Sequence, residues 1–483
     1  MDALFCGIDA GTQGARCLLV TEKGEVLGEG HSSYRRPRVE GLPEEWFEQN
    51  PADWMEAIAR AVGAALEGGA RAADVRAIGV TSTSGTLCAL ETDGGVVRPA
   101  IMYSDGRSRN EARRVQQAGA SLAKSLGYRF KPSFGLPKIL WMKRHEPDLF
   151  ERADLFVSPT DFVIGLLTGE WGRTDQTNAL KFGYDLLGGS WPDFIEADLG
   201  IPVGKLPRVQ MSGEEAGRLG QEWAERLGLP AGTFVAAGLT DGCASLFSSG
   251  ATAPGQFNTT IGTTLVVKGV SRELLLDPAG RIYCHRHPEG WWLPGGASNT
   301  GAECIAEQFD PDTRDRLTEE VLRHSPTDLV SYPLVGRGER FPFNAPDAGP
   351  FLLGDPAGPA ERFCAYLEGV ACLERMAYQV LEELGAAVEE PIFSAGGGAE
   401  NDGWLQIRAD TMGRAVVRPR ITGAAMGAAI VGAVAARKGS LSDAAESMVR
   451  VEREVEPRPE LLERYAEKYA NFCDQCRRCG YLG

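Results

Sequence analysis

The chain has 483 residues, of which 43% are hydrophobic and 24% charged, and its formal net charge is −16. Chains longer than about 250–300 residues usually divide into more than one domain, because a single hydrophobic core does not grow further. Two domains are therefore expected. The negative charge argues against nucleic acid and anionic membranes as partners, because both are polyanions. The N-terminus lacks the basic residues of a signal peptide, and no run of about 18 apolar residues occurs, which predicts a cytoplasmic protein without a membrane span.

The first predicted element is a β-hairpin. Leu4 to Ile8 is apolar, Asp9 to Gly14 is a turn rich in glycine and polar residues, and Ala15 to Val20 resumes an extended pattern. Apolar runs separated by such a turn predict paired strands. A third strand is expected at Val26 to Glu29.

A helix and two further strands follow in the first half. Trp54 to Leu66 has helical periodicity, with Asp53 as its predicted N-cap. Val75 to Val80 reads as a strand that leads into a polar run. Phe234 to Ala237 is another strand, followed by a loop of small residues that carries Asp241.

The second half repeats the opening pattern. Gln256 to Ile261 and Leu265 to Lys268 read as strands joined by a Gly-Thr-Thr turn. Pro391 to Ser394 is a strand, followed by a triple-glycine turn and a helix over Asn401 to Met412. Two halves of this kind predict a duplicated α/β architecture with a cleft between two domains. The predicted division is 1–248 and 249–483, with the last helices packing back on the first domain.

The first turn has the groups that phosphoryl transfer requires, namely donors for phosphate charge and a carboxylate for a metal. Gly11 and Gly14 allow close approach of the backbone to phosphate, and Thr12 adds a hydroxyl. Arg16 adds positive charge, and Asp9 can orient a hydrated Mg²⁺. The alternative is a plain turn whose glycines serve conformation alone.

Three further motifs have both a functional and a structural interpretation. Gly262-Thr263 repeats the Gly-Thr pattern of the first turn and predicts a second phosphate-binding turn. A plain hairpin is the alternative. The loop Gly396-Gly-Gly398 would let a flat ring lie along the backbone, beside Asn401 and Trp404, unless it is only a tight turn. Asp241 lies at a strand end, where α/β sites gather, but a helix N-cap is the alternative.

Three of the eleven cysteines are closely spaced at Cys473, Cys476 and Cys479. A metal site needs a fourth ligand, and none follows in the sequence, so a structural helix or tail is favoured over a metal or redox role. The remaining cysteines are scattered, as is typical of reduced thiols.

Taken in order, these motifs resemble the FGGY carbohydrate kinases of the actin and hexokinase superfamily. The resemblance rests on Asp9 to Arg16, Glu48-Gln-Asn-Pro51, Gly238 to Ser245, Gly262-Thr263, Ala395 to Trp404 and Gly423 to Ala429. It implies two actin/hexokinase-like (ribonuclease H-like) domains, ATP and Mg²⁺ as cofactors, and a small-molecule sugar as substrate. A homodimer is compatible with this interpretation.

The resemblance also implies roles for individual residues. Asp241 would be the general base, and Asp9 would hold Mg²⁺ through water. Gln13 and the hairpin residues named above would surround the phosphates, whereas Gly397, Gly398, Asn401 and Trp404 would line the adenine pocket. Nucleotide-dependent switches such as actin share these hairpins but have no need of Asp241 facing a sugar, which leaves them as the alternative class.

For the sugar, the run Ser82 to Thr86 stands where xylulose kinases usually carry Gln-Met-His. Together with Asn178 to Tyr184, Gly295 to Asn299 and Arg337 to Pro342, this run resembles D-ribulose kinases, which implies that Ser84 contacts the sugar. Xylulose, sedoheptulose and polyols are the alternative substrates. Asp105 and Arg107 resemble a motif of other FGGY members and would either contact substrate or form a salt bridge.

Overall fold

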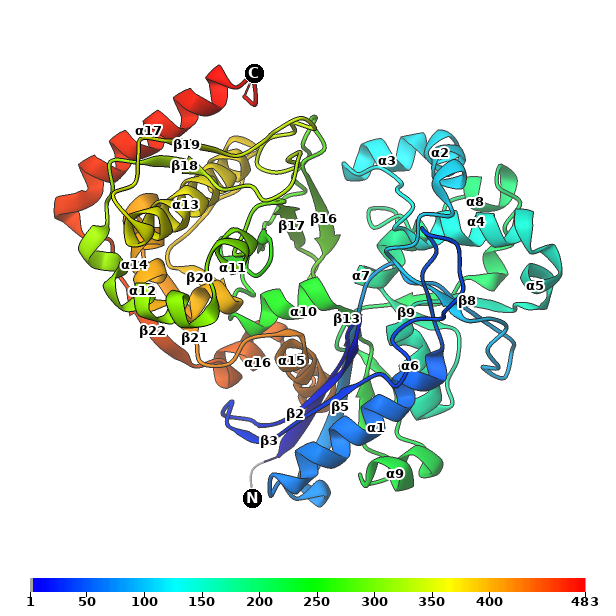
Figure 1. Ribbon diagram of the computed structural model, residues 1–483. Helices are drawn as coiled ribbons and strands as arrows, with labels where there is room; N and C mark the ends of the chain where they lie inside the picture. The colour runs from blue at the N-terminus through cyan, green and yellow to red at the C-terminus, as the bar shows by residue number, and fades with distance from the viewer. Residues whose placement is uncertain (1–2, 483) are drawn as a thin grey trace. The chain divides into compact units, whose positions relative to one another are not determined.

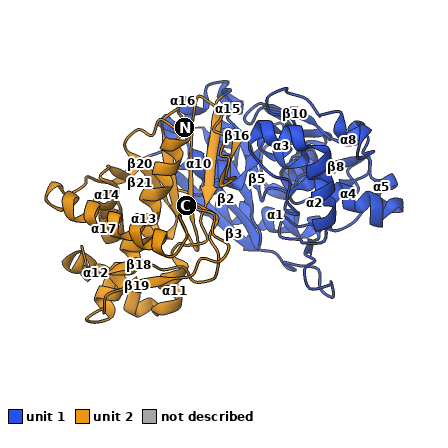
Figure 2. Ribbon diagram, turned by 90° about the horizontal axis from the view of Figure 1, so that it is seen from above, with its two compact units in different colours: residues 1–248, 285–290, 423–449 blue, residues 249–284, 291–422, 450–483 orange. Residues whose placement is uncertain are grey.

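The computed structural model describes residues 3–482, which form two compact units (Figure 2). Unit 1 contains the chain up to residue 248 together with 285–290 and 423–449. Unit 2 contains 249–284, 291–422 and the residues from 450 onward. No helix within 3–482 is long and apolar enough to cross a membrane.

The central sheet of unit 1 has the strand order β11-β12-β5-β1-β2-β3, and the short β13 also pairs with β5 (Figure 1). β1 is antiparallel to β2 and parallel to β5, which confirms the predicted N-terminal hairpin. The strands are β1 Leu4–Ala10, β2 Gly14–Thr21, β3 Val26–Ser33, β5 Val75–Ser82, β11 Glu215–Arg218, β12 Phe234–Ala236 and β13 Leu239–Thr240.

The central sheet of unit 2 has the order β16-β17-β15-β14-β20-β21-β22. β14 and β15 form the second predicted hairpin. The strands are β14 Phe257–Ile261, β15 Leu265–Gly269, β16 Ile282–Arg286, β17 Trp292–Ala297, β20 Ile392–Ala395, β21 Val416–Pro419 and β22 Val451–Val455.

The two sheets repeat one topology. From β3 to β11 in unit 1, successive pairs are antiparallel, antiparallel, parallel, parallel and antiparallel. From β17 to β22 in unit 2 the same sequence of pairings recurs. The chain is therefore a duplicated, ribonuclease H-like α/β protein, as its repeated hairpins predict.

Helices complete both units. In unit 1 they are α1 Pro51–Glu67, α2 Arg109–Ala118, α3 Ala120–Leu126, α4 Gly135–His145, α5 Pro147–Arg152, α6 Pro159–Thr168, α7 Gln176–Ala179, α8 Phe194–Ala197, α9 Gln221–Leu227, α10 Asp241–Ser248, α15 Ala424–Arg437 and α16 Leu441–Met448. In unit 2 they are α11 Glu303–Gln308, α12 Pro311–His324, α13 Pro359–Glu383, α14 Asp402–Met412 and α17 Leu462–Arg478.

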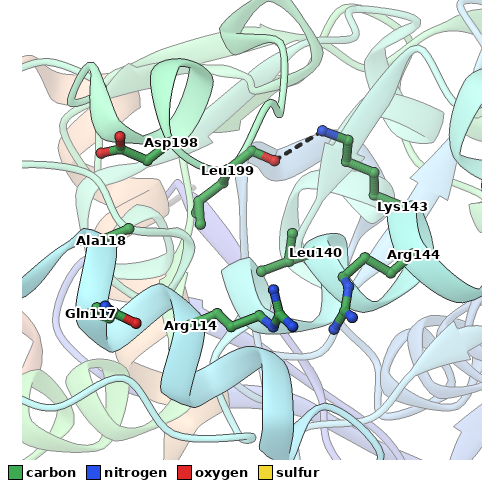
Figure 3. A pocket seen from close by; sticks show the side chains of 8 residues that line it. All are labelled: Arg114, Gln117, Ala118, Leu140, Lys143, Arg144, Asp198 and Leu199. Carbon is green, nitrogen blue, oxygen red and sulfur yellow. Dashed lines mark hydrogen bonds between the residues drawn. The ribbon is translucent and has the colours of Figure 1, made fainter.

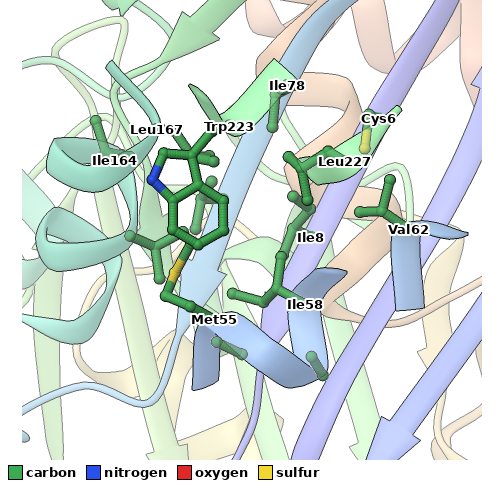
Figure 4. Packing of buried hydrophobic residues seen from close by; sticks show 14 of the residues in the cluster. Cys6, Ile8, Met55, Ile58, Val62, Ile78, Ile164, Leu167, Trp223 and Leu227 are labelled. Carbon is green, nitrogen blue, oxygen red and sulfur yellow. The ribbon is translucent and has the colours of Figure 1, made fainter. Parts of the chain in front are cut away.

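Helix α1 covers one face of the unit 1 sheet. Side chains alternate across a strand, so Cys6 and Ile8 of β1 share a face, and both lie in one buried cluster with Ile58 and Val62 of α1 (Figure 4). The predicted cap of this helix is wrong by three residues. Asn50 is the N-cap, because its side chain accepts a hydrogen bond from the Ala52 N–H at 3.0 Å, whereas Asp53 lies inside the first turn.

Helix α15 lies against the strands through glycines that a side chain would block. A Cβ atom on Gly7 of β1 would stand 1.9 Å from the carbonyl oxygen of Ala425, and one on Gly79 of β5 would stand 1.8 Å from that of Ala428. Gly427 of the helix approaches Ala244 of α10 in the same way. The small-residue pattern after residue 423 is therefore needed for close packing within unit 1.

We expect Gly79→Ala to destabilise the protein by about 3 kcal/mol or more, because a rigid backbone carbonyl lies where the methyl group would stand. Gly63→Ala is the matched control. Gly63 lies inside α1 with open space beside it, so its replacement should be neutral or slightly stabilising. Chemical denaturation of both variants measures the difference, and equal midpoints would contradict the packing described here.

The C-terminal cysteines lie on α17 within an apolar cluster of unit 2. Cys473 and Cys476 are buried there with Cys372 of α13, and Cys479 is exposed. Burial raises the pKa of the Cys476 thiol, which keeps it protonated. Residues 3–482 contain no group of three or more His, Cys, Asp or Glu side chains arranged to hold a metal.

Candidate active site

Two carboxylates meet at the ends of parallel strands in unit 1. Asp9 of β1 lies opposite Thr81 of β5, and Thr240 of β13 lies opposite the next residue of β5, Ser82. Asp241 follows Thr240 directly and is the first residue of α10. Burial and the charge of Asp241 together raise the pKa of Asp9 to about 7, against the opposing effect of Arg16. The fold thus brings together the two acidic residues singled out in the sequence.

The Asp9 carboxylate has an oxygen suited to a cation. Its Oδ1 is enclosed and has no hydrogen-bond partner within residues 3–482. An enclosed, negatively charged oxygen without a donor is costly unless a cation or a bound water reaches it. Hard divalent ions such as Mg²⁺ take carboxylate oxygens and retain waters, so the residues present fit Mg²⁺ at this position.

The first hairpin turn is held in place by hydrogen bonds to its carbonyl oxygens. The Tyr34 hydroxyl donates to the Gly11 carbonyl at 2.8 Å, and Gln49 Nε2 donates to the Thr12 carbonyl at 2.8 Å. These bonds use carbonyl oxygens, while the side chains of Gln13 and Arg16 are exposed. The turn is therefore fixed in shape, with the side chains of Gln13 and Arg16 exposed and the Thr12 hydroxyl 3.5 Å from that of Tyr103.

The strand before Asp241 is held in place by a buried chain of hydrogen bonds. The Thr177 hydroxyl donates to Asp175 at 2.6 Å and accepts the Thr240 N–H at 2.9 Å. Asp175 and Thr177 are both buried, and Asp175 caps α7 by accepting the N–H groups of Thr177 and Asn178. On the other side of the strand, the Thr81 hydroxyl donates to the Leu239 carbonyl at 2.9 Å. The backbone that carries Asp241 is thus held at two points.

Ser84 lies in the loop after β5, and its hydroxyl is buried without a hydrogen-bond partner in the described chain. The Ser84 Oγ is enclosed without a hydrogen bond within the described chain, while Lys181 Nζ donates to the Ser84 carbonyl at 3.1 Å. Gly85 has a φ of +89°, and the carbonyl of Ser133 would lie 2.1 Å from any Cβ there. A buried hydroxyl without a hydrogen bond is unusual, so Ser84 stays a candidate for contact with a substrate hydroxyl.

Asp105 and Arg107 form the salt bridge that was one of their two predicted roles. Their side chains are joined at 2.7 Å, and both are completely buried. Arg107 also pairs with Glu48 at 2.7 Å and lies over the Trp46 ring at 3.9 Å. The ion pair braces the segment before α2, and contact with substrate stays a prediction for both residues.

Lys138 of α4 is a buried amine close to these groups. Its Nζ donates to the Pro132 carbonyl at 2.6 Å and to the Phe134 carbonyl at 3.2 Å. Burial, with a smaller contribution from Lys181, lowers the pKa of Lys138 to about 7. A neutral amine can still donate both hydrogen bonds, so the contacts survive deprotonation.

This depressed pKa makes stability depend on pH. In the unfolded chain Lys138 stays protonated up to about pH 10.4, so between pH 7 and 10 the unfolded state binds the extra proton and stability rises with pH. We expect Lys138→Met to be less stable overall and to lose this rise. Urea denaturation at several pH values measures it, and an unchanged slope in the variant would contradict the assignment.

Unit 2 carries the second hairpin and the glycine loop side by side. Gly396 has a φ of +81°, and a Cβ there would meet the Ile261 carbonyl oxygen at 2.5 Å. A Cβ on Gly398 would lie 2.7 Å from the Ile261 side chain. Ile261 ends β14 directly before Gly262 and the exposed Thr263, so glycine is required for this loop to lie against the base of the hairpin.

A cavity of about 320 Å³ opens beside this loop. Its lining residues are Ser394, Gly396, Ala399, Glu400, Arg418, Pro419, Arg420, Thr422 and Glu452. Asn401 and Trp404 have other partners. Asn401 caps α14 by accepting the Trp404 N–H at 2.9 Å, and the buried Trp404 donates to the Leu367 carbonyl at 3.0 Å. These two side chains therefore support the helix behind the cavity.

Several supporting residues were missed from the sequence. Tyr34 and Lys181 donate to the carbonyls of Gly11 and Ser84. Thr177 accepts the N–H of Thr240, the residue before Asp241, and Asp175 accepts the Thr177 hydroxyl. Asp175 has a local signal, because Asp is a favoured N-cap residue. The hydrogen bond of Thr177 to Thr240 spans 63 residues and has no signal in one sequence.

Comparisons with known proteins identify the family of this chain. The sequence matches the FGGY family of carbohydrate kinases, N-terminal domain, over residues 4–248 and the C-terminal domain of the same family over 257–436. It is 28% identical to a xylulose kinase of Bacillus subtilis over 95% of this chain and 94% of the relative. It is 24% identical to a gluconokinase of Bacillus licheniformis over 99% of this chain and 96% of the relative.

Among solved structures, the xylulose kinase from Rhodospirillum rubrum superimposes with a TM-score of 0.85 and 26% identity, over 98% of each chain. The family models together span most of the residues that form both sheets, including both hairpins and Asp241. This chain belongs to the FGGY family of carbohydrate kinases and is a sugar kinase of the ATP-using kind.

Proposed function

We propose that this kinase transfers the γ-phosphoryl group of ATP to the terminal hydroxyl of a ketose, with D-ribulose as the first candidate. The observation that carries the proposal is that Asp9 and Asp241 lie at the ends of the two strands that flank β5 and interact electrostatically. Phosphoryl transfer needs positioned charge and a base near the attacking hydroxyl, and these two carboxylates can divide the tasks.

Asp241 is the proposed general base, which takes the proton from the sugar hydroxyl. Asp9 is the proposed carboxylate for Mg²⁺, because its Oδ1 lacks a donor. When bound, the ion supplies charge neutralisation for the phosphate oxygens. We assign the contacts with phosphate to Thr12, Gln13 and Arg16 of the first hairpin and to Gly262 and Thr263 of the second.

The proposed nucleoside site is the cavity beside the glycine loop of unit 2. Gly397 and Gly398 belong to that loop, and Gly396, Arg418 and Arg420 line the cavity. A flat base can lie against a backbone that has no side chains. Asn401 and Trp404 contribute indirectly in this proposal, by fixing the helix that follows the loop.

The choice of sugar depends on the Ser84 loop. Its enclosed Oγ offers a hydrogen-bonding position where xylulose kinases usually present Gln-Met-His, which favours D-ribulose. D-xylulose is the second candidate, because relatives that cover nearly all of the chain are named xylulose kinases. Purified enzyme with Mg-ATP should be assayed with D-ribulose, D-xylulose, gluconate and glycerol. The highest kcat/KM with D-ribulose supports the proposal, and ATP turnover that no sugar stimulates overturns it.

Thr177→Val tests how the base is positioned. Valine keeps the shape of threonine but removes the hydroxyl, leaving the Thr240 N–H and one oxygen of Asp175 without this partner. We expect kcat to fall about tenfold with a small change in KM, because Asp241 is no longer held in place. Thr177→Ser should restore most of the rate. Equal effects of the serine and valine variants would contradict a hydrogen-bonding role.

A further inference from the structure

One segment of unit 1 has a charge opposite to that of the chain as a whole. Residues 106–145 contain ten Lys and Arg residues and a single acidic residue, Glu111, a formal charge of +9. Subtracting this from the −16 of the whole chain leaves −25 for the other residues. Such a local excess of cations opposes folding by self-repulsion, so its concentration in one place calls for an explanation.

The segment contains α2, and a pocket lies along each of two sides of this helix. The pocket of about 580 Å³ lined by Arg114, Lys143 and Arg144 is compensated internally (Figure 3). Lys143 Nζ donates to the Leu199 carbonyl at 2.9 Å, Arg144 pairs with Glu111, and Asp198 also lines the cavity. The positive charge of this pocket is therefore balanced by groups of the protein and needs no bound anion.

The second pocket, which we name the Arg129 pocket, has a volume of about 490 Å³. It is lined by Arg109, Ala112, Arg113, Gln116, Arg129, Phe130, Lys131 and Pro132, so four cations and no carboxylate line it. The cations are exposed, whereas Ala112 and Phe130 are buried and Pro132 is partly buried. The pocket therefore has a basic rim over an apolar floor.

The floor is preformed and one rim cation has no partner. The Phe130 N–H donates to Gln116 Oε1 at 2.9 Å, and Lys138 fixes the Pro132 carbonyl from behind. Arg109 pairs with Glu45 at 2.7 Å. The Arg129 side chain, by contrast, makes no hydrogen bond or ion pair anywhere in residues 3–482, although it lines the same pocket as Arg113.

We propose that the Arg129 pocket binds a small organic phosphate ester. The guanidinium groups of Arg113 and Arg129 suit the oxygens of a phosphate, which Arg binds with paired N–H donors. Phe130 and Pro132 receive the apolar part of the ligand, and the volume lies in the usual range for small-molecule sites. An extended polyanion would be repelled by the formal charge of −25 that the residues outside this segment carry. None of the lining residues is one that we assign to the active site.

The test is calorimetric titration of the full chain with phenyl phosphate, inorganic phosphate and benzyl alcohol as probes. The charge-reversal variant R113E/R129E is compared with K124E/R208E, which reverses two exposed cations of unit 1 that do not line the pocket. Sugar-kinase activity in the absence of probe should be retained by both variants and verifies that they are folded.

We expect phenyl phosphate to bind the wild type and K124E/R208E alike, and R113E/R129E at least tenfold more weakly. Inorganic phosphate should bind more weakly than the ester, because it does not engage the floor, and the alcohol should not bind. The proposal is overturned if phenyl phosphate gives no binding to the wild type, or if R113E/R129E binds it as tightly as the control variant. Equal affinity for inorganic phosphate and the ester would overturn the organic part of the assignment.

Discussion

Replacing Asp241 by alanine is expected to lower the rate of phosphoryl transfer by about 10²–10⁴-fold, the range typical for loss of a general base. The sugar hydroxyl would then have no carboxylate to receive its proton, while positioning and charge stabilisation would persist. ATP affinity should change little, because no residue that we assign to the nucleotide is altered. Steady-state kinetics with the preferred sugar, together with an ATP-binding titration, measure both quantities.

Asp148→Ala, at an exposed position in the first turn of α5, is the matched control for this variant. This substitution also removes an acidic side chain of unit 1, but at a position that is not at the strand ends, and the variant should retain full activity. Turnover retained by Asp241→Ala would remove our assignment of the base. Loss of both turnover and ATP binding would indicate instead that Asp241 shapes the fold of the site.

Asp9→Asn is expected to weaken the response to Mg²⁺ by about 10–100-fold, because an oriented carboxylate near a metal typically contributes that much to its affinity. Asparagine has the same shape but no charge. The midpoint of a Mg²⁺ titration of the rate should therefore shift upward, and kcat/KM at fixed Mg²⁺ should fall.

A stability measurement separates this loss from misfolding. The variant removes a negative charge that is enclosed beside Asp241, so its midpoint of denaturation should be equal to or higher than that of the wild type. Functional residues are commonly kept at a cost to stability, and a stable but Mg²⁺-insensitive variant would fit that pattern. An unchanged Mg²⁺ midpoint would count against Asp9 as the metal residue.

The features predicted well are those set by local sequence. Both hairpins and the strand that leads to Asp241 follow from apolar runs broken by glycine and polar residues, and the pairing Ile261 to Leu265 lies where it was expected. The duplicated fold was predictable because two such hairpins recur in one chain. Periodicity placed α1 correctly but not its cap, because Asn50 and Asp53 are equally good capping residue types.

The features that escaped prediction depend on tertiary contacts. The sequence did not indicate that Asn401 caps α14 or that the Trp404 indole donates to the Leu367 carbonyl. Asp105 and Arg107 are fixed by Glu48 and Trp46, which precede them by more than fifty residues. Likewise, the sequence motif around Gln49 gave no sign that its amide holds the Thr12 carbonyl.

The position of α15 in the chain has a consequence for biosynthesis. The grooves at Gly7 and Gly79 are filled by a helix that begins at Ala424, more than 340 residues after the second of them. During translation the first sheet leaves the ribosome long before its cover exists, and one apolar face stays exposed to other nascent chains. We therefore expect the newly made N-terminal half to need protection by a chaperone until the final sixth of the polypeptide has been synthesised.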